Sequence, residues 1–241
     1  MFKQLLLLLP IIYFKERYVM LVYYLIIALL TLFVILLIRA ELAGNQKQIY
    51  LFKPLSTTLV IIVAALSIFV PDKYNLSYTL AIILGLLFSF SGDVVLMFKS
   101  KRAFMIGLIL FLIAHVVYSI VFTVYSGFVK RDLISAVVLI LLAIIIYFYL
   151  YPGLEKMKIP VFVYIIVISL MMNRAISTFS GKFFNYSQAL LISIGAALFY
   201  ISDLILAINK FRKPFKYHRI NLAFYYSGQL LIALSTGFFI Y

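Results

Sequence analysis

Two aspartates stand in apolar stretches that are long enough to cross a membrane. Asp93 lies in the stretch FSFSGDVVLMF at 88–98, and Asp203 lies in LFYISDLILAI at 198–208. An unpaired carboxylate is costly in hydrocarbon, so a carboxyl group inside a membrane span needs a polar partner or a function. The sequence therefore raises the question of what two intramembrane carboxyl groups do.

A pair of carboxyl groups at one depth is suited to acid–base chemistry. Asp93 and Asp203 each lie five residues before the end of a predicted segment, and both segments run in the same direction. Both carboxyl groups are therefore expected about 8 Å inside the same boundary. One protonated carboxyl group can donate a proton while a charged one stabilises a cation, as in glycosidases. The structural alternative is that each Asp only hydrogen-bonds a neighbouring helix.

Other polar residues are expected near the same depth. Lys53 begins the second segment, and Asn221, Tyr225 and Gln229 form an i, i+4, i+8 stripe on the last one. His115 is expected near the middle of the membrane, where it could relay a proton or orient water. Each also has a structural interpretation, in which Lys53 extends to the interface and His115 packs in the core. Their convergence favours a site.

Asn173 and Arg174 are expected on the opposite side of the membrane, on the sixth segment. Arg174 either extends outward to the interface or turns inward to pair with an Asp. Ser169 and Ser177 lie on the same helix face as Asn173.

The elements that must position these residues follow from composition. The 241 residues are 66% hydrophobic and 12% charged, with a mean hydropathy of +1.18, which indicates an all-α, polytopic membrane helix bundle. We predict an N-terminal interfacial segment at 1–18, kinked at Pro10, and an eight-helix transmembrane domain at 19–241. The eight predicted segments are 19–38, 51–70, 78–98, 104–126, 133–151, 159–178, 187–208 and 219–240.

Composition also excludes several classes of function. The net charge of +14 comes from Lys and Arg that lie largely in short loops, where contacts with lipid headgroups explain it, so we expect the lipid bilayer as partner and no nucleic acid. The chain has no Cys and two His, which argues against thiol chemistry and a His-rich metal centre. No metal or other cofactor is expected.

The distribution of Lys and Arg between the loops predicts the orientation in the membrane. Eleven basic residues lie on the side of the two Asp and seven on the other side, which predicts that the Asp side is cytoplasmic, although the basic N-terminal arm favours the reverse.

The two halves of the chain also show an internal similarity. A shift of 110 residues places Asp93 on Asp203 and His115 on Tyr225. Two parallel repeats of four helices are therefore expected. The expected location is a bacterial inner membrane.

Short motifs on successive segments resemble those of the YhhN-like lysoplasmalogenase family. The similarity covers roughly 50–240. The motifs are FKPLSTTLV, SGDVVLMF, GLILFLIAHVVYSIVF, SLMMNRAI, ISDLILAINKF and YYSGQLLIA. The residues at the family's motif positions are Lys53, Asp93, His115, Asn173, Arg174, Asp203, Tyr225 and Gln229.

The resemblance implies an eight-helix membrane hydrolase that acts on lysophospholipids. Its members cleave the vinyl ether bond of lysoplasmalogens into a fatty aldehyde and glycerophosphoethanolamine or glycerophosphocholine. This chemistry needs an acid that is protonated near neutral pH and a negative charge beside an oxocarbenium ion, and Asp93 and Asp203 are suited to both roles. For such a substrate, Lys53, and Arg174 if it turns inward, could hold the phosphate, and Tyr225 could face the choline or ethanolamine cation. The alternative is a transporter or flippase that uses the same polar cavity. A closed pocket open to one leaflet would favour the enzyme.

Overall fold

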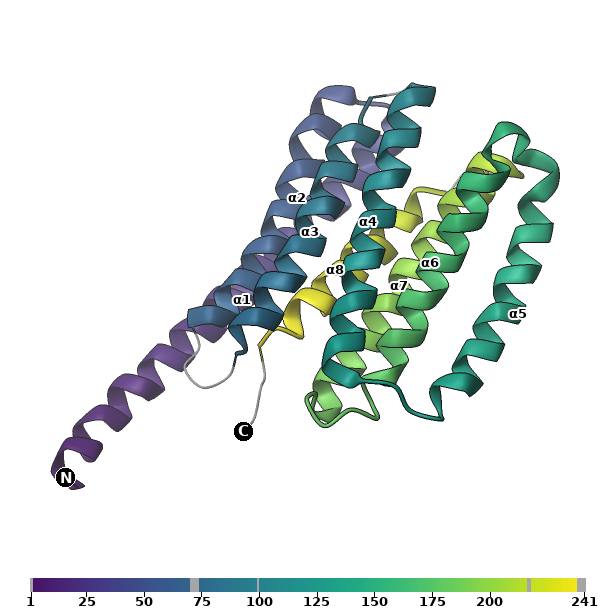
Figure 1. The fold of residues 1–241 in the computed structure, drawn as a ribbon. Coiled ribbons are helices and arrows are strands. Elements are labelled where there is room, and N and C mark those ends of the chain that lie inside the picture. Colours follow the sequence, from purple (N-terminus) through teal and green to yellow (C-terminus); the bar gives the residue numbers. More distant parts are fainter. Residues whose placement is uncertain (1, 70–73, 99, 216–217, 238–241) are drawn as a thin grey trace.

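The computed structural model describes the chain except residues 1, 70–73, 99, 216–217 and 238–241, with side chains described from Met20 onward. Its described residues form eight α-helices joined by short loops and 3₁₀ turns, which confirms the all-α prediction (Figure 1). The helices are α1 Phe2–Ala43, α2 Gln46–Leu66, α3 Leu76–Leu96, α4 Lys101–Ser126, α5 Asp132–Leu150, α6 Lys158–Ser177, α7 Tyr186–Phe211 and α8 Asn221–Leu234.

Polar caps explain where several helices begin. The side chains of Asn45, Asn75 and Ser100 accept hydrogen bonds from backbone N–H groups three residues later, at the starts of α2, α3 and α4. Asn185 does the same for α7 and forms a capping box with Gln188. Such caps satisfy N–H groups that have no partner inside the helix. Short polar signals therefore separate the apolar runs into helices.

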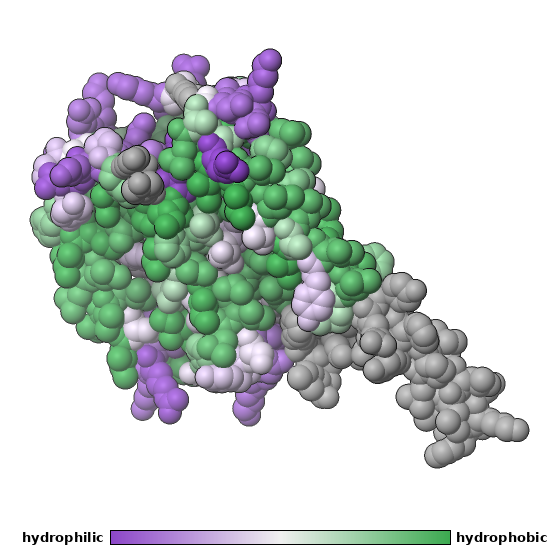
Figure 2. All heavy atoms as spheres, turned by 180° about the vertical axis from the view of Figure 1, so that it is seen from behind, coloured by the Kyte–Doolittle hydropathy of each residue, from purple (hydrophilic) through white to green (hydrophobic). Residues whose placement is uncertain are grey.

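Seven helices of the described chain are long and apolar enough to cross a membrane, namely α1 to α7. Figure 2 shows a broad hydrophobic belt between two hydrophilic ends, which suits a multi-pass integral membrane protein. α8 has 14 residues, fewer than the about 20 that a span needs. The prediction of helical segments is thus confirmed for eight helices and for seven candidate spans, and an eighth crossing stays a prediction.

The N-terminal helix is longer than one crossing requires. α1 has 42 residues and therefore a length of roughly 60 Å, against about 30 Å of hydrocarbon. Residues 2–18 continue the helix that carries the first span. Their position at the membrane interface stays a prediction.

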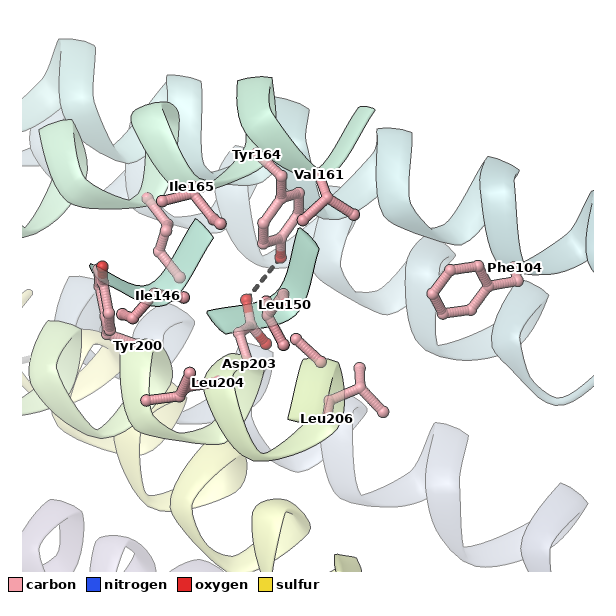
Figure 3. A pocket seen from close by; sticks show the side chains of 12 residues that line it. Phe104, Ile146, Leu150, Val161, Tyr164, Ile165, Tyr200, Asp203, Leu204 and Leu206 are labelled. Atoms are coloured by element: carbon pink, nitrogen blue, oxygen red, sulfur yellow. Dashed lines mark hydrogen bonds between the residues drawn. The ribbon is translucent and has the colours of Figure 1, made fainter. Parts of the chain in front are cut away.

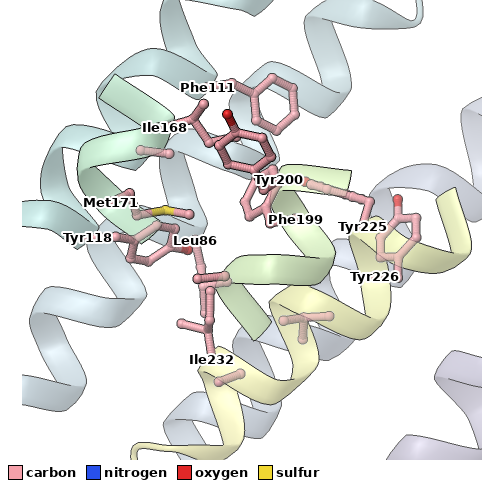
Figure 4. Packing of buried hydrophobic residues seen from close by; sticks show 14 of the residues in the cluster. Leu86, Phe111, Tyr118, Ile168, Met171, Phe199, Tyr200, Tyr225, Tyr226 and Ile232 are labelled. Atoms are coloured by element: carbon pink, nitrogen blue, oxygen red, sulfur yellow. The ribbon is translucent and has the colours of Figure 1, made fainter. Parts of the chain in front are cut away.

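Helices pair closely where small residues remove side-chain bulk. α3 packs on α4 where the Tyr118 ring covers Gly85, and α7 packs on α8 where Gly195 meets Gly228. A Cβ atom on Gly195 would lie 2.8 Å from the carbonyl oxygen of Gly228. Close backbone approach at small residues is a common basis of helix packing in membranes. Around these contacts, buried aromatic and aliphatic side chains form the core (Figure 4).

Replacement of Gly195 by Ala should destabilise the bundle. Its new methyl group would lie 2.8 Å from the Gly228 carbonyl oxygen and 2.9 Å from Ile232 Cγ1. Because the helix backbone cannot move aside as a side chain can, α7 and α8 must separate. We expect a loss of about 1–3 kcal/mol in the free energy of unfolding, measured by thermal unfolding in detergent. Gly237→Ala is the control, because its Cβ would meet nothing closer than 3.8 Å. Equal midpoints for both variants would contradict this packing argument.

Candidate active site

Asp93 is held in a buried network of polar groups from three helices. The hydroxyl groups of Thr57 on α2 and Tyr225 on α8 each donate to Asp93 Oδ2 at 2.7 Å. Lys53 Nζ lies 3.6 Å from Asp93 Oδ1. The Tyr226 hydroxyl donates to the Lys53 carbonyl oxygen at 3.2 Å, which ties α8 to α2. Two donors and an ammonium group suit a charged carboxylate at this position.

Asp203 has a different environment. Its Oδ2 accepts one hydrogen bond, from the Tyr164 hydroxyl of α6 at 2.5 Å (Figure 3). His115 Nε2 lies 3.8 Å from the same oxygen, too far for a hydrogen bond. The His115 ring meets the Tyr164 ring edge-on, with centroids 5.3 Å apart. Among the described residues, no Lys or Arg forms an ion pair with Asp203.

Both carboxyl groups line one polar cavity of about 420 Å³. Tyr164, Tyr225 and Lys53 also line it. Asp93 and Asp203 thus share one cavity, and their joint role as a catalytic pair stays a prediction. The cavity lies at the helix ends where α3 and α7 finish and α4 and α8 begin.

The rim of this cavity is rich in basic groups. Lys101 and Lys210 line it, and within the described chain neither has a carboxylate partner. Lys210 Nζ lies 4.8 Å from the centroid of the Phe104 ring. Arg219 also lines the rim but pairs with Glu41 at 3.1 Å. Of the described cations that line the cavity, Lys101 and Lys210 are therefore the two that an anionic ligand can reach without displacing a carboxylate.

The other predicted site residues lie at different depths. Gln229 is fully buried, and its Oε1 accepts a hydrogen bond from Tyr118 at 3.3 Å, behind the residues that line the cavity. Lys53, proposed from the sequence as a phosphate ligand, lines the cavity and pairs with Asp93, and its role as a phosphate ligand stays a prediction. His115 is fully buried beside Tyr164 and Phe199.

Asn173 and Arg174 form a separate cluster near the far end of α6. Arg174 Nη1 donates to Asp132 Oδ2 at 2.9 Å, and its Nη2 donates to the carbonyl oxygen of Gly127. Asn173 Nδ2 donates to the Asp132 carbonyl oxygen at 2.9 Å and to Ser135 Oγ at 2.8 Å. The structure does not bring this pair to the cavity of Asp93 and Asp203. Arg174 does turn inward to an Asp, as one interpretation of the sequence held, but that Asp begins α5.

Thr57, Tyr164 and the two rim lysines are site residues that the sequence alone does not single out. Thr57 lies one helical turn after Lys53, so the i, i+4 spacing is a usable signal. Tyr164 lies near the start of its helix, at the same end of the bundle as Asp203, but it is one of 19 tyrosines. Lys101 and Lys210 resemble ordinary interfacial charges. Only the packing of the helices distinguishes them.

The fold and the cavity define a multi-pass, all-α membrane protein with two carboxyl groups in one polar site. Residues 48–236 match the YhhN family, and the chain belongs to this family, as its motifs predict. No solved structure shows a significant match.

Among curated proteins, the chain is similar to lysoplasmalogenase TMEM86A of Bos taurus, with 33% identity over 159 residues. It is also similar to lysoplasmalogenase TMEM86A of Homo sapiens, with 34% identity over 159 residues. Each match covers 64% of this chain and 64% of the relative. A lysoplasmalogenase homolog of Dictyostelium discoideum is 26% identical over 196 residues, covering 66% of this chain and 64% of the relative. The matches thus span less than two thirds of each relative.

Proposed function

We propose that this protein is a membrane-embedded hydrolase that cleaves the vinyl ether bond of lysoplasmalogens. The products are a fatty aldehyde and a glycerophospho alcohol. The observation that carries the proposal is the asymmetry of the two carboxyl groups in one cavity. Asp93 is paired with Lys53 and accepts hydrogen bonds from two hydroxyl groups, whereas Asp203 accepts a single hydrogen bond, from one hydroxyl group. Family membership and the names of the relatives support the substrate class.

The asymmetry assigns different roles to the two aspartates. Because Asp93 has a cation beside it, it serves as the lasting negative charge of the site. Asp203 lacks a cation among the described residues, and its Oδ1 accepts no hydrogen bond there, so we assign it the transferable proton. The Tyr164 hydroxyl then stabilises the Asp203 carboxylate that forms once the proton has left.

The reaction proceeds by protonation at carbon. Asp203 gives its proton to the alkenyl carbon farther from the ether oxygen, and the double bond supplies the electron pair. The resulting oxocarbenium ion is stabilised by the two carboxylates. Water adds to the carbon bonded to the ether oxygen and returns one proton to Asp203. The hemiacetal then breaks its bond to the glycerol oxygen, which takes the hydroxyl proton, so one water is consumed.

The polar cavity also has a place for the headgroup. Lys101 and Lys210 on its rim can hold the phosphate, which leaves Lys53 free to pair with Asp93. Tyr225 has its hydroxyl on Asp93, so it orders the acidic side rather than binding a cation through that group. His115 packs on Tyr164 and makes no hydrogen bond to Asp203, and we assign it a positioning role.

The geometry of the two halves supports the proposed repeat. The shift of 110 residues that relates Asp93 to Asp203 also relates Gly85 to Gly195. Both glycines lie at close helix contacts, α3 with α4 and α7 with α8. In two repeats of four helices, α2 corresponds to α6 and α4 corresponds to α8. The contact of α2 with α8 therefore has an equivalent in the contact of α6 with α4, and both are present.

The residues around the carboxyl groups follow the same relation. Tyr225 of the second half contacts Asp93 of the first, and His115 of the first half lies near Asp203 of the second. We propose that two four-helix repeats form the site at their interface. Each aspartate would then face a residue from the last helix of the other repeat.

Transport remains the alternative function, and the position of the cavity favours hydrolysis. A transport path must reach both faces, whereas the lining residues of the polar cavity gather at one end. Deeper in the bundle, Leu86, Tyr118 and Phe122 are fully buried in the core. Figure 4 shows such side chains filling the space between the helices.

The proposed function is tested by incubating the purified protein with an alkenyl lysophospholipid and measuring free aldehyde. The control substrate is the saturated alkyl ether with the same chain and headgroup, because it has no double bond to protonate. Release of aldehyde from the alkenyl lipid alone is the expected result. No release above the protein-free rate, combined with movement of the lipid between leaflets of protein-containing vesicles, would favour transport.

Removal of the Tyr164 hydroxyl should slow the reaction. Tyr164→Phe deletes the hydrogen bond to Asp203 while keeping the ring that packs on His115. A hydrogen bond to a charged group contributes about 1.5–3 kcal/mol, so we expect a loss of about 10- to 100-fold in turnover. Tyr125→Phe, in the aromatic cluster with Tyr78 and Phe183, is the control. Full activity of folded Tyr164→Phe would remove Tyr164 from the mechanism.

A further inference from the structure

A second, apolar crevice meets the polar cavity at Asp203. Its lining comes mainly from α5, α6 and α7 (Figure 3). Its apolar lining includes Ile146, Leu150, Val161, Ile165, Leu204 and Ala207. Asp203, Tyr164, Phe104 and Leu206 line both spaces. The proposed acid thus stands where a charged space and an apolar space join.

The crevice lies on a side of the bundle that faces hydrocarbon. α5 packs against α6 and touches α7 only slightly, so the helices leave a gap over α6. α5 stands at the edge of the bundle in Figure 1. Apolar residues on both flanks are exposed, with Ile145 on α5 at 65% and Ile201 on α7 at 40%. In a bilayer such surfaces contact acyl chains, so the crevice is reached sideways from the lipid.

We propose that this crevice binds the first carbons of the hydrocarbon chain of a single-chain amphiphile whose headgroup occupies the polar cavity. The chain enters between α5 and α7 from the bilayer. This inference rests on the proposed function, because it places the alkenyl carbons of the substrate at Asp203. The basic rim, with Lys101 and Lys210, lies at the headgroup end, and the apolar lining lies at the chain end.

The size of the crevice limits what it holds. Its volume is about 60 Å³, against about 420 Å³ for the polar cavity. A cavity needs about 10–15 Å³ of this kind of volume to hold one water molecule, so the crevice has room for about four groups of that size. The rest of the chain therefore stays among the lipids. Bulk near the ether bond should impair binding, while chain length beyond the first carbons should matter little.

Photolabelling tests this arrangement without requiring cleavage. The probe is a saturated alkyl-ether lysophospholipid that carries a diazirine on the third chain carbon, bound to the full-length protein in nanodiscs. We expect mass spectrometry to find the label on the crevice-lining parts of α5, α6 and α7, and an excess of unlabelled lysophospholipid to prevent it. A second probe with the diazirine at the chain end should label lipid-facing residues broadly.

Two matched variants sharpen the test. Ala207→Phe fills the crevice and should lower crevice labelling about tenfold. Ala143→Phe is the control, because Ala143 is also partly buried but lines a separate apolar groove between α5 and α6. Both variants are first compared by thermal unfolding. If Ala207→Phe does not fold, the positions labelled in the wild-type protein alone show whether the crevice binds the chain.

The outcomes separate this inference from the proposed function. If the third-carbon probe labels the groove that contains Ala143, the proposal that the crevice binds the hydrocarbon chain is wrong. The same holds if this probe labels residues as broadly as the chain-end probe does. Aldehyde release without crevice labelling also overturns this proposal and leaves the hydrolase intact. Crevice labelling without aldehyde release supports the chain site and removes the hydrolase.

Discussion

Asp203→Asn and Asp93→Asn should each abolish most aldehyde release from an alkenyl lysophospholipid. Asn keeps the shape of the side chain but cannot donate a carboxyl proton or carry its charge. Loss of a general acid typically costs about 10²- to 10⁴-fold, and we expect both single variants in this range. The double variant should be little worse than either one, because groups that act as a unit are strongly non-additive.

The measurement is turnover per folded protein, with thermal unfolding recorded for each variant. Glu155→Gln is the control, since it changes an exposed carboxylate outside the cavity. A structural role for the aspartates predicts instead that residual activity follows the folded fraction. Near-wild-type turnover in either folded Asn variant would refute the paired-carboxylate mechanism.

Arg174→Met should destabilise the protein strongly. Arg174 and Asp132 are 2% and 10% exposed in their side chains and 2.9 Å apart. Removing the guanidinium leaves a carboxylate without its cation and the Gly127 carbonyl oxygen without its donor. Breaking a buried pair in this way costs about 3–5 kcal/mol. Thermal unfolding in detergent should show a correspondingly lower midpoint.

A double variant tests whether this cost comes from the unpaired charge. Arg174→Met combined with Asp132→Leu removes both charges and should recover much of the stability, because apolar pairs often replace buried ion pairs at little cost. Turnover per folded protein should stay near wild type in both variants, since the cluster lies outside the cavity. Normal stability with a raised KM would instead restore Arg174 as a substrate ligand.

The sequence predicts the aspartate pair better than its surroundings. Helix length and direction place a residue in depth, and these two quantities are enough to put Asp93 and Asp203 at one level. Depth does not define which helices are neighbours or how each is rotated. Tyr164 is therefore not predicted, and two orientations stay open for Arg174. Its partner, Asp132, begins a helix, where an Asp is expected to complement the helix dipole rather than a buried cation.

The helices themselves follow closely from hydropathy because backbone groups in hydrocarbon must bond within their own segment. α8 is the exception. The mostly apolar stretch at 219–240 predicts a span, whereas the described helix covers Asn221–Leu234. Hydropathy predicts that these residues lie in apolar surroundings. It does not distinguish a helix that crosses the membrane from a shorter helix that packs against α7.

Protonation of the alkenyl carbon by the site can be followed by running the reaction in D₂O. The released aldehyde is reduced at once to its alcohol and examined by mass spectrometry. Because one solvent-derived proton is added to carbon, we expect a single deuterium on the carbon next to the former aldehyde group, formed by the wild type and lost with Asp203→Asn. Aldehyde without deuterium at that carbon would rule out protonation at carbon.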